Sequence, residues 1–219
     1  MTKANHPAMH KTVEIERKYD ADESATLPLL HLLPGVDSVD QPVEHRLEAT
    51  YFDTEDLALA THRITCRRRT GGDDDGWHLK MPSDIDERFE FREPLGKDPE
   101  TVPLPLLRLV RAQIREKPLV PVARLRTRRL VHRLNGPDGV LAEVCDDQVE
   151  AEALVPDGST SRWREWEIEL ADGQRGLLDA AEGPFTAAGG RPAGHASKLM
   201  RRWAQPPRLH PLLRNPSGR

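Results

Sequence analysis

Strict alternation between charged and apolar residues recurs along this chain, and it constrains the fold more than any other feature. The sharpest case is the segment 162–170, in which three glutamates alternate with large apolar residues: Glu165, Trp166, Glu167, Ile168, Glu169 and Leu170. Successive side chains of a β-strand point to opposite faces, so a period of two predicts a strand with one charged and one apolar face. A chain built from several such strands must accommodate several charged faces.

The same period predicts further strands, separated in many places by turns rich in glycine, proline or asparagine. Besides 162–170, we expect strands at 13–19, 43–53, 62–69, 77–81, 87–93, 122–134, 140–147 and 148–154. Apolar residues spaced for one face of a helix predict helices at 22–33, 104–116, 173–185 and 193–203. Asp53, at the end of the second strand, is expected to accept hydrogen bonds from nearby backbone.

The charged faces have two possible locations. On an open sheet they meet solvent, and the opposite faces form the core. In an antiparallel sheet closed into a barrel, alternate residues line the interior. Charges enclosed in this way are costly unless they are paired or bind a metal or ligand. The segment 87–93, with three charged residues opposite two phenylalanines, is compatible with either location.

Composition restricts the classes of function. A formal net charge of −4 gives no general reason to expect nucleic-acid binding. No apolar run approaches the ~18 residues of a membrane span, and residues 1–11 read as a disordered leader without an apolar signal segment. Cys66 and Cys145 form neither a CxxC motif nor a disulfide framework, which favours buried thiols in a reducing cytoplasm. Residues 205–219 read as a C-terminal tail.

Several short motifs resemble, in order along the chain, those of the CYTH family, also called triphosphate tunnel metalloenzymes. They are Glu14-x-Glu16-x-Lys18, Tyr51-Phe52-Asp53-Thr54, Arg67-x-Arg69 followed by Trp77-x-Leu79-Lys80, the late Glu-x-Glu run from Glu165 to Glu169, and Ser197-Lys198. The resemblance implies an α+β fold in which residues 12–204 form a closed antiparallel eight-stranded β-barrel, or tunnel, with helices packed outside. We expect a monomer or a homodimer.

The resemblance also implies hydrolysis of triphosphate groups with Mg²⁺ or Mn²⁺ inside the tunnel. Carboxylate oxygens suit these cations, and guanidinium and ammonium groups suit phosphate oxygens. The expected metal ligands are Glu14, Glu16, Glu167, Glu169 and Asp147, with Asp146 replacing Asp147 if a bulge shifts the register. The expected phosphate ligands are Lys18, Arg67, Arg69, Lys80, Arg88, Arg92, Arg126, Arg128 and Lys198. The expected catalytic residues are Glu14, Glu16 and Lys18, with Glu90 and Glu143 holding a second metal or the attacking water.

The sequence narrows the substrate mainly by what it lacks. It contains no Gly-x-x-x-x-Gly-Lys-Ser/Thr loop, no Gly-x-Gly-x-x-Gly motif and no recognisable adenine pocket. This favours inorganic triphosphate over thiamine triphosphate or ATP. The nine histidines lack zinc-ligand spacing, and we expect them at the surface or in turns. Two alternatives stay open, a polyphosphate- or nucleotide-binding module without turnover and a class IV adenylate cyclase.

Overall fold

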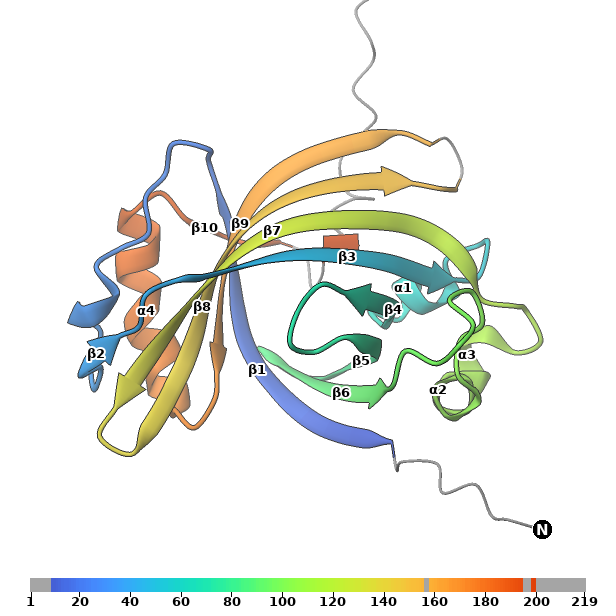
Figure 1. The fold of residues 1–219 in the computed structure, drawn as a ribbon, viewed down its shortest axis with the longest axis horizontal. Helices are drawn as coiled ribbons and strands as arrows, with labels where there is room; N and C mark the ends of the chain where they lie inside the picture. Colours follow the sequence, from blue (N-terminus) through green and yellow to red (C-terminus); the bar gives the residue numbers. More distant parts are fainter. Residues whose placement is uncertain (1–8, 156–157, 195–197, 200–219) are drawn as a thin grey trace, which may run out of the picture.

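The computed structural model describes residues 9–155, 158–194 and 198–199, and eight of its antiparallel strands close into a barrel (Figure 1). In spatial order, the ring consists of β1 (His10–Ala21), β6 (Glu87–Glu93), β5 (Gly76–Asp84), β4 (Thr65–Thr70), β3 (Val43–Asp53), β7 (Val120–Gly136), β8 (Gly139–Ala153) and β9 (Thr160–Leu170). Two short strands join its outside: β2 (Ser38–Val39) pairs with β7, and β10 (Arg191–Pro192) pairs with β1. The barrel predicted from the resemblance is confirmed.

Strand β1 closes the barrel because it pairs with two different strands along its length. From His10 to Ile15 it pairs with β6, and from Glu16 to Ala21 it pairs with β9. The predicted strand 13–19 therefore lies within a longer one, which already includes residues 10 and 11 of the expected leader.

Helix α4 (Arg175–Ala187) covers apolar residues on the outside of the barrel near this seam. The buried side chains of Leu178, Ala181 and Phe185 pack with Trp166 and Ile168 of β9. Phe185 meets the Trp166 ring edge-on, with their centroids 6.0 Å apart. The apolar face of the segment 162–170 is thus turned outward, onto a helix, which leaves its glutamates on the inner face.

Three shorter helices, α1 (Ala58–Thr61), α2 (Leu104–Leu109) and α3 (Arg111–Ile114), cover the outside of β4 and β5. Leu106 and Ile114 pack there with Trp77 and Leu79, all of them almost fully buried. The packed helices on both sides confirm the expected arrangement of helices outside the barrel. Within the residues that the structure describes, no helix is long and apolar enough to span a membrane.

A third apolar cluster lies beside the charged interior. Tyr51, Leu125, Val149, Trp163 and Leu199 belong to it. Tyr51 and Leu125 also border a small cavity together with charged residues of the interior. One part of the inner surface is therefore closed by apolar packing, and the charged part is confined to the remainder.

The structure corrects several sequence-based expectations. The segment 22–33 contains only a 3₁₀ turn, η1 (Leu30–Leu32), because Pro28 lacks an N–H and disfavours helical backbone at the residue before it. The segment 104–116 forms α2 and α3, which are separated at Val110, where φ is −109°. The segment 148–154 continues β8 without a break to Ala153. The expected helix at 193–203 and the tail at 205–219 fall largely or wholly outside the described residues.

Asp53 has the local structural role expected of it. Its Oδ1 accepts hydrogen bonds from the backbone N–H groups of Thr54 and Leu59 at 2.7 and 2.8 Å, and its Oδ2 accepts one from Ala60 at 2.9 Å. These bonds satisfy donors at the start of α1, so the buried carboxylate fixes the turn that follows β3.

Candidate active site

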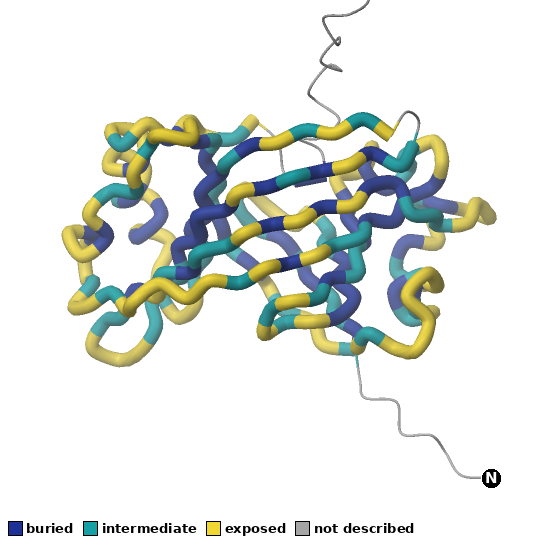
Figure 2. Tube along the Cα trace, turned by 45° about the horizontal axis from the view of Figure 1, so that its top comes forward, coloured by how far each residue is buried: buried dark blue, intermediate teal, exposed yellow. Residues whose placement is uncertain are grey.

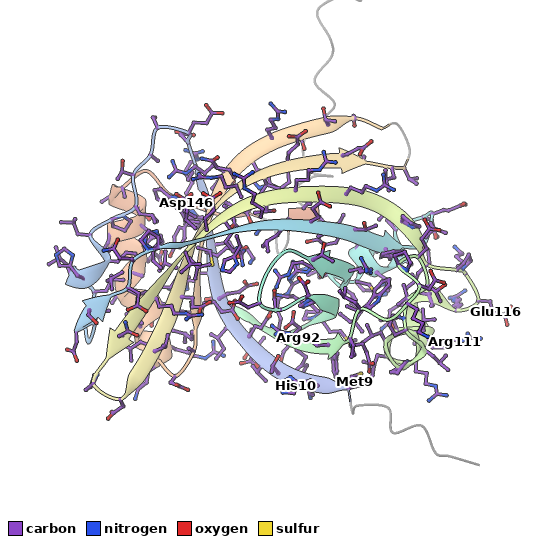
Figure 3. The ribbon with its side chains drawn as sticks, viewed as in Figure 1. Met9, His10, Arg92, Arg111, Glu116 and Asp146 are labelled. Atoms are coloured by element: carbon purple, nitrogen blue, oxygen red, sulfur yellow. The ribbon has the colours of Figure 1, made fainter. Side chains whose placement is uncertain are left out.

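A cavity of about 270 Å³ lies inside the barrel, and charged side chains form most of its wall. Nine lysines and arginines and seven aspartates and glutamates line it. The cavity therefore carries a positive net charge in a chain whose overall formal charge is −4. In Figure 3 the side chains crowd the space between β3 and β6, and Arg92 is labelled there. The charged faces of β1, β4, β6 and β9 thus meet an enclosed interior.

Three carboxylates gather on one side of this cavity, those of Glu14, Glu16 and Glu169. Glu16 and Glu169 are direct partners across β1 and β9. Glu14 contacts the ammonium group of Lys80, and Glu16 Oε2 lies 2.5 Å from Lys18 Nζ. Burial opposes ionisation of Glu16, but Lys18 and Lys80 outweigh it and lower its pKa to about 2. Burial and the carboxylates of Glu14 and Glu16 raise the pKa of Glu169 to about 7.

This group of three carboxylates fits a divalent cation. Within the described part of the chain, Glu16 Oε1 is buried without a hydrogen-bond partner. Carboxylate oxygens are the ligands that Mg²⁺ and Mn²⁺ prefer. A cation would also relieve the repulsion that raises the pKa of Glu169. Glu14, Glu16 and Glu169 are therefore the residues best placed to hold a metal.

A second acidic group, formed by Asp147, Glu165 and Glu167, already surrounds a cation of the protein. One oxygen of each lies within 4.8 Å of the others, close enough for a shared metal. Lys198 Nζ lies among them, 2.9 Å from Asp147, 2.5 Å from Glu165 and 2.6 Å from Glu167. Lys198 Nζ donates a hydrogen bond to Glu167 Oε1, and the charges of Asp147 and Glu165 also hold its ammonium group.

This arrangement changes the expected roles of three residues. Lys198 was expected to bind phosphate, but its ammonium group is ion-paired with three carboxylates, which raise its pKa well above the usual value despite its burial. Asp147 and Glu167 were expected to bind metal together with Glu14 and Glu16, but they lie in this separate, ion-paired group. Asp147 does face inward, and Asp146 lies on the outer face, where Arg164 Nη2 is 2.7 Å from it. The alternative register is therefore wrong.

Arg129 and Lys18 connect the two acidic groups. Arg129 donates to both oxygens of Asp147, at 2.8 and 2.6 Å, and to Glu167 Oε2 at 2.6 Å. Lys18 Nζ lies 2.5 Å from Glu16 and 2.7 Å from Glu167, so two of its donors are used and one is left. Sequence reasoning missed Arg129 because it assigned the inner face of this strand to the preceding arginines.

Arg67 and Arg69 of β4 face the cavity from the side of β3 and β5. Arg67 Nη1 lies 3.4 Å from the hydroxyl of Tyr51, and the Nε of both arginines is buried without a hydrogen-bond partner among the described residues. Burial and the guanidinium groups of Arg67 and Arg129 lower the pKa of Arg69 to about 9. Crowded guanidinium groups with unused donors are suited to an anion that carries several oxygens.

Lys80, Arg88 and Arg92 extend this basic wall along β5 and β6. Arg88 donates to the backbone carbonyl of Arg63 at 3.1 Å, and Arg92 contacts Glu90. Lys80 Nζ lies 3.8 Å from Glu90 Oε1. Glu90, expected to hold a second metal or the attacking water, is fully buried behind these cations. Burial opposes its ionisation, but the hydrogen bond with His78 and the charges of Lys80 and Arg67 outweigh it and lower its pKa. Its position supports a role in orienting the basic side chains.

Among the histidines that the structure describes, His78 is the one that departs clearly from the expected surface or turn position. It is 1% exposed, with Nδ1 2.8 Å from Glu90 Oε1 and Nε2 2.9 Å from the backbone carbonyl of Asp74. Both ring nitrogens thus face oxygen acceptors, which only the protonated imidazolium satisfies, and the adjacent Glu90 carboxylate stabilises that charge against the effect of burial. Its position two residues before Lys80, on an alternating strand, was the signal in the sequence that placed it on the inner face.

Arg126 and Arg128, expected to bind phosphate, lie on the outer face of β7. The side chain of Arg126 is 76% exposed and lies 3.5 Å from Glu48, while Arg128 Nη2 lies 2.7 Å from Glu44. Figure 2 shows the alternation of buried and exposed residues along the long strands of this wall. The inner face of β7 carries Leu125, Thr127 and Arg129 instead, so the expectation for Arg126 and Arg128 is wrong.

Glu143, expected to act in catalysis, lines the cavity at a partly exposed position. Its Oε1 lies 2.9 Å from Arg133 Nε, and Arg133 also lines the cavity. Glu143 is the cross-strand partner of Glu169. It therefore borders the carboxylate group from the more open side, and sequence reasoning missed Arg133.

Known proteins resemble this chain in sequence and in fold. The CYTH domain family model matches residues 12–185. Two uncharacterised proteins of Mycobacterium tuberculosis, from strains CDC 1551 and H37Rv, are each 43% identical over 212 residues. The matches cover 90% of this chain and 41% of each relative, so the chain spans less than half the length of these curated relatives.

A solved structure extends the likeness in fold. It is that of a candidate adenylate cyclase from Bacillus halodurans, with a TM-score of 0.57. The two chains are 18% identical, and the match covers 87% of this chain and 97% of the other. At this identity the likeness concerns the fold alone.

Proposed function

The chain belongs to the CYTH domain family, and from this premise we propose that it hydrolyses a triphosphate group inside its tunnel with the help of Mg²⁺ or Mn²⁺. We propose inorganic triphosphate as the substrate, because charged side chains form most of the cavity wall.

One observation carries the proposal. The same enclosed cavity joins a carboxylate group, Glu14, Glu16 and Glu169, to a basic wall in which Arg67 and Arg69 have unused donors. Phosphoryl transfer needs a cation and several positive side chains around one phosphate chain, because catalysis there is mostly positioning and charge stabilisation. A structural barrel core would gain nothing from this arrangement of buried charge.

Glu14, Glu16 and Glu169 would hold the metal ion. When bound, Mg²⁺ or Mn²⁺ supplies a Lewis acid that withdraws charge from phosphate oxygens. Lys18 and Lys80 neutralise Glu16 and Glu14 in the structure. Both lysines therefore lie at the boundary between carboxylates and phosphates, and the remaining donor of Lys18 is available to a phosphate oxygen.

The basic wall would bind and orient the phosphate chain. Arg67, Arg69 and Arg92 offer planar, forked donors that match phosphate oxygens, and Arg88 and Lys80 add charge on the same side. Glu90 forms ion pairs with Lys80 and Arg92 and is itself in contact with His78, so it holds both basic side chains in place. Because Arg69, Arg88 and Glu90 are buried, their interactions are less screened by water than those of exposed charges.

The lining favours a substrate without a base. Among the described lining residues, only His45, Leu47, Tyr51 and Val131 offer sizeable apolar or aromatic surface. Nucleotide sites normally provide a predominantly apolar or aromatic surface for the base. A class IV adenylate cyclase, which acts on ATP, is therefore the less favoured alternative.

A binding module for polyphosphate or a nucleotide is the second alternative. It would use the basic wall equally well. It would not benefit from the carboxylates of Glu14, Glu16 and Glu169, because their charge repels a polyanion in the absence of a metal. The presence of all three on the cavity wall therefore favours the hydrolase over the binding module.

The test is phosphate release from inorganic triphosphate, ATP and thiamine triphosphate, each with Mg²⁺, Mn²⁺ or EDTA. We expect release from inorganic triphosphate that EDTA abolishes. Formation of cyclic AMP from ATP would support the cyclase. Tight binding of polyphosphate without release from any substrate would support the binding module.

A further inference from the structure

The loop between β4 and β5 brings an acidic residue onto the basic wall. Asp73 and Asp74 of this loop both line the cavity. The carboxylate of Asp74 contacts the guanidinium group of Arg69, and its Oδ2 lies 3.9 Å from Arg92 Nη2. Arg69 and Arg92 are two of the side chains proposed to bind phosphate. A carboxylate of the protein therefore occupies donors that a phosphate would use.

The position of Asp74 is fixed by the backbone of the loop. Its carbonyl oxygen accepts a hydrogen bond from the buried His78 at 2.9 Å. At the base of the loop, Gly71 has a φ of +93°, and a Cβ there would lie 2.0 Å from the carbonyl oxygen of Arg46. The loop is thus packed closely against β3 and tied to β5, which directs Asp74 toward the cavity.

Asp74 also balances part of the positive charge of the basic wall. Arg69 is 7% exposed and lies near Arg67 and Arg129, whose positive charges act on it. Guanidinium groups held this close together are stabilised by a nearby anion. The Asp74 carboxylate supplies one that matches a guanidinium group as a phosphate does.

We propose that Asp74 takes the place of a phosphate group on Arg69 and Arg92, and that a substrate must displace its carboxylate to bind there. Asp74 is then a residue that sets substrate affinity and favours ligands with enough negative charge to replace it. This inference rests on the proposed function for the identity of the anion. Beyond that function, it assigns to Asp74 a carboxylate that competes with the substrate for Arg69 and Arg92.

The test is a calorimetric titration of inorganic triphosphate in EDTA, where binding is measured without turnover. Asp74→Asn keeps the shape and the backbone contacts of the residue but removes its charge. We expect the variant to bind triphosphate about tenfold more tightly than the unaltered protein, because a charge-assisted contact no longer competes. The matched control is Asp73→Asn, an exposed residue of the same loop, for which we expect less than about a threefold change because solvent and salt screen it.

A double-mutant cycle tests whether the gain in triphosphate affinity acts through Arg69. In the background of Arg69→Gln, we expect Asp74→Asn to give no gain in affinity, because the donor for which both anions compete is gone. If Asp74 serves only to hold the loop, Asp74→Asn will lower the melting temperature and weaken binding, and the inference is wrong. Equal gains for Asp74→Asn and Asp73→Asn would also overturn it, because they would indicate a general charge effect.

The outcomes separate this inference from the proposed function. If the unaltered protein hydrolyses triphosphate but Asp74→Asn binds it no more tightly, the function stands and the inference fails. If no substrate is hydrolysed but Asp74→Asn still tightens triphosphate binding through Arg69, the inference stands for a binding protein. If neither form binds triphosphate in EDTA, the inference is wrong, and the proposed function then stands or falls on phosphate release with Mg²⁺ or Mn²⁺.

Discussion

Glu16 of β1 and Glu169 of β9 are direct cross-strand partners at the seam where the barrel closes. Two carboxylates opposite each other destabilise a sheet unless a cation lies between or beside them. Lys18 forms an ion pair with Glu16, whereas the pKa of Glu169 is raised to about 7. The seam of the barrel is therefore also the place where we propose that a metal binds.

Glu169 should make the stability of the metal-free protein depend on pH. Its pKa is about 7 when folded against 4.5 for the free side chain, so the folded state holds its proton more tightly. Stability contributed by this group is present below pH 4.5 and is lost as the pH rises through 7. In EDTA at pH 8, we expect Glu169→Gln to be more stable than the unaltered protein by about 1–2 kcal/mol, and this gain should shrink at pH 5. Urea unfolding at both pH values measures the difference, and an equal gain at both would contradict it.

Glu14→Gln and Glu16→Gln should each lose metal-dependent turnover but still fold. We expect phosphate release with saturating triphosphate to fall by about 100-fold or more, because an amide is a poorer metal ligand than a carboxylate. Colorimetric phosphate release with Mn²⁺ measures this, and circular dichroism checks the fold. The control is Glu48→Gln on the outer face of the barrel, where the side chain is 71% exposed. Turnover in both variants equal to that of the control would remove Glu14 and Glu16 from the mechanism.

Lys198 should act on stability more than on substrate affinity. Lys198→Met removes the cation from three buried carboxylates, and we expect a loss of about 3–5 kcal/mol in the free energy of unfolding. Lys117→Met is the matched control, since Lys117 forms an exposed ion pair with Asp56, and it should cost less than about 1 kcal/mol. Urea denaturation measures both. A stable Lys198→Met protein with weakened triphosphate binding would restore Lys198 as a phosphate ligand.

Arg67 and Arg126 provide a paired test of which arginines face the substrate. Arg67→Ala should weaken triphosphate binding by about 10- to 100-fold, because it removes a forked donor from the enclosed cavity. Arg126→Ala should leave the affinity within about twofold, because its exposed side chain contributes only a screened charge. Titration of both variants with triphosphate in EDTA gives the two dissociation constants. A large loss of affinity for Arg126→Ala would place the anion on the outer face.

The alternation in the sequence predicted most of the strands, because a period of two is imposed by strand geometry itself. It also identified the inward residues wherever the other face was clearly apolar, as in β9, where Trp166 and Ile168 pack under α4. Where proline interrupted an apolar segment, as at Pro28, the apolar spacing gave a helix that the backbone does not form.

Strand β7 shows where the same reasoning fails. Its two faces carry Arg124, Arg126 and Arg128 on one side and small or apolar residues on the other, so the sequence suggested an inward row of arginines. The structure places that row outside, opposite the glutamates of β3, because the inner face at this end of the barrel meets the apolar cluster around Leu199. Which face of a strand points inward depends on its neighbours, and residues distant in sequence supply them.

The sequence by itself determined the strands, the residue types of the site and, through its motifs, the family to which the chain belongs. The tertiary structure decided which charges neutralise one another. It separated Glu14, Glu16 and Glu169 from the carboxylates around Lys198, brought Arg129 and His78 into the interior, and set Asp74 against Arg69. Alternation is a local property of the backbone, whereas the pairing of buried charges depends on distances between strands that only the closed barrel fixes.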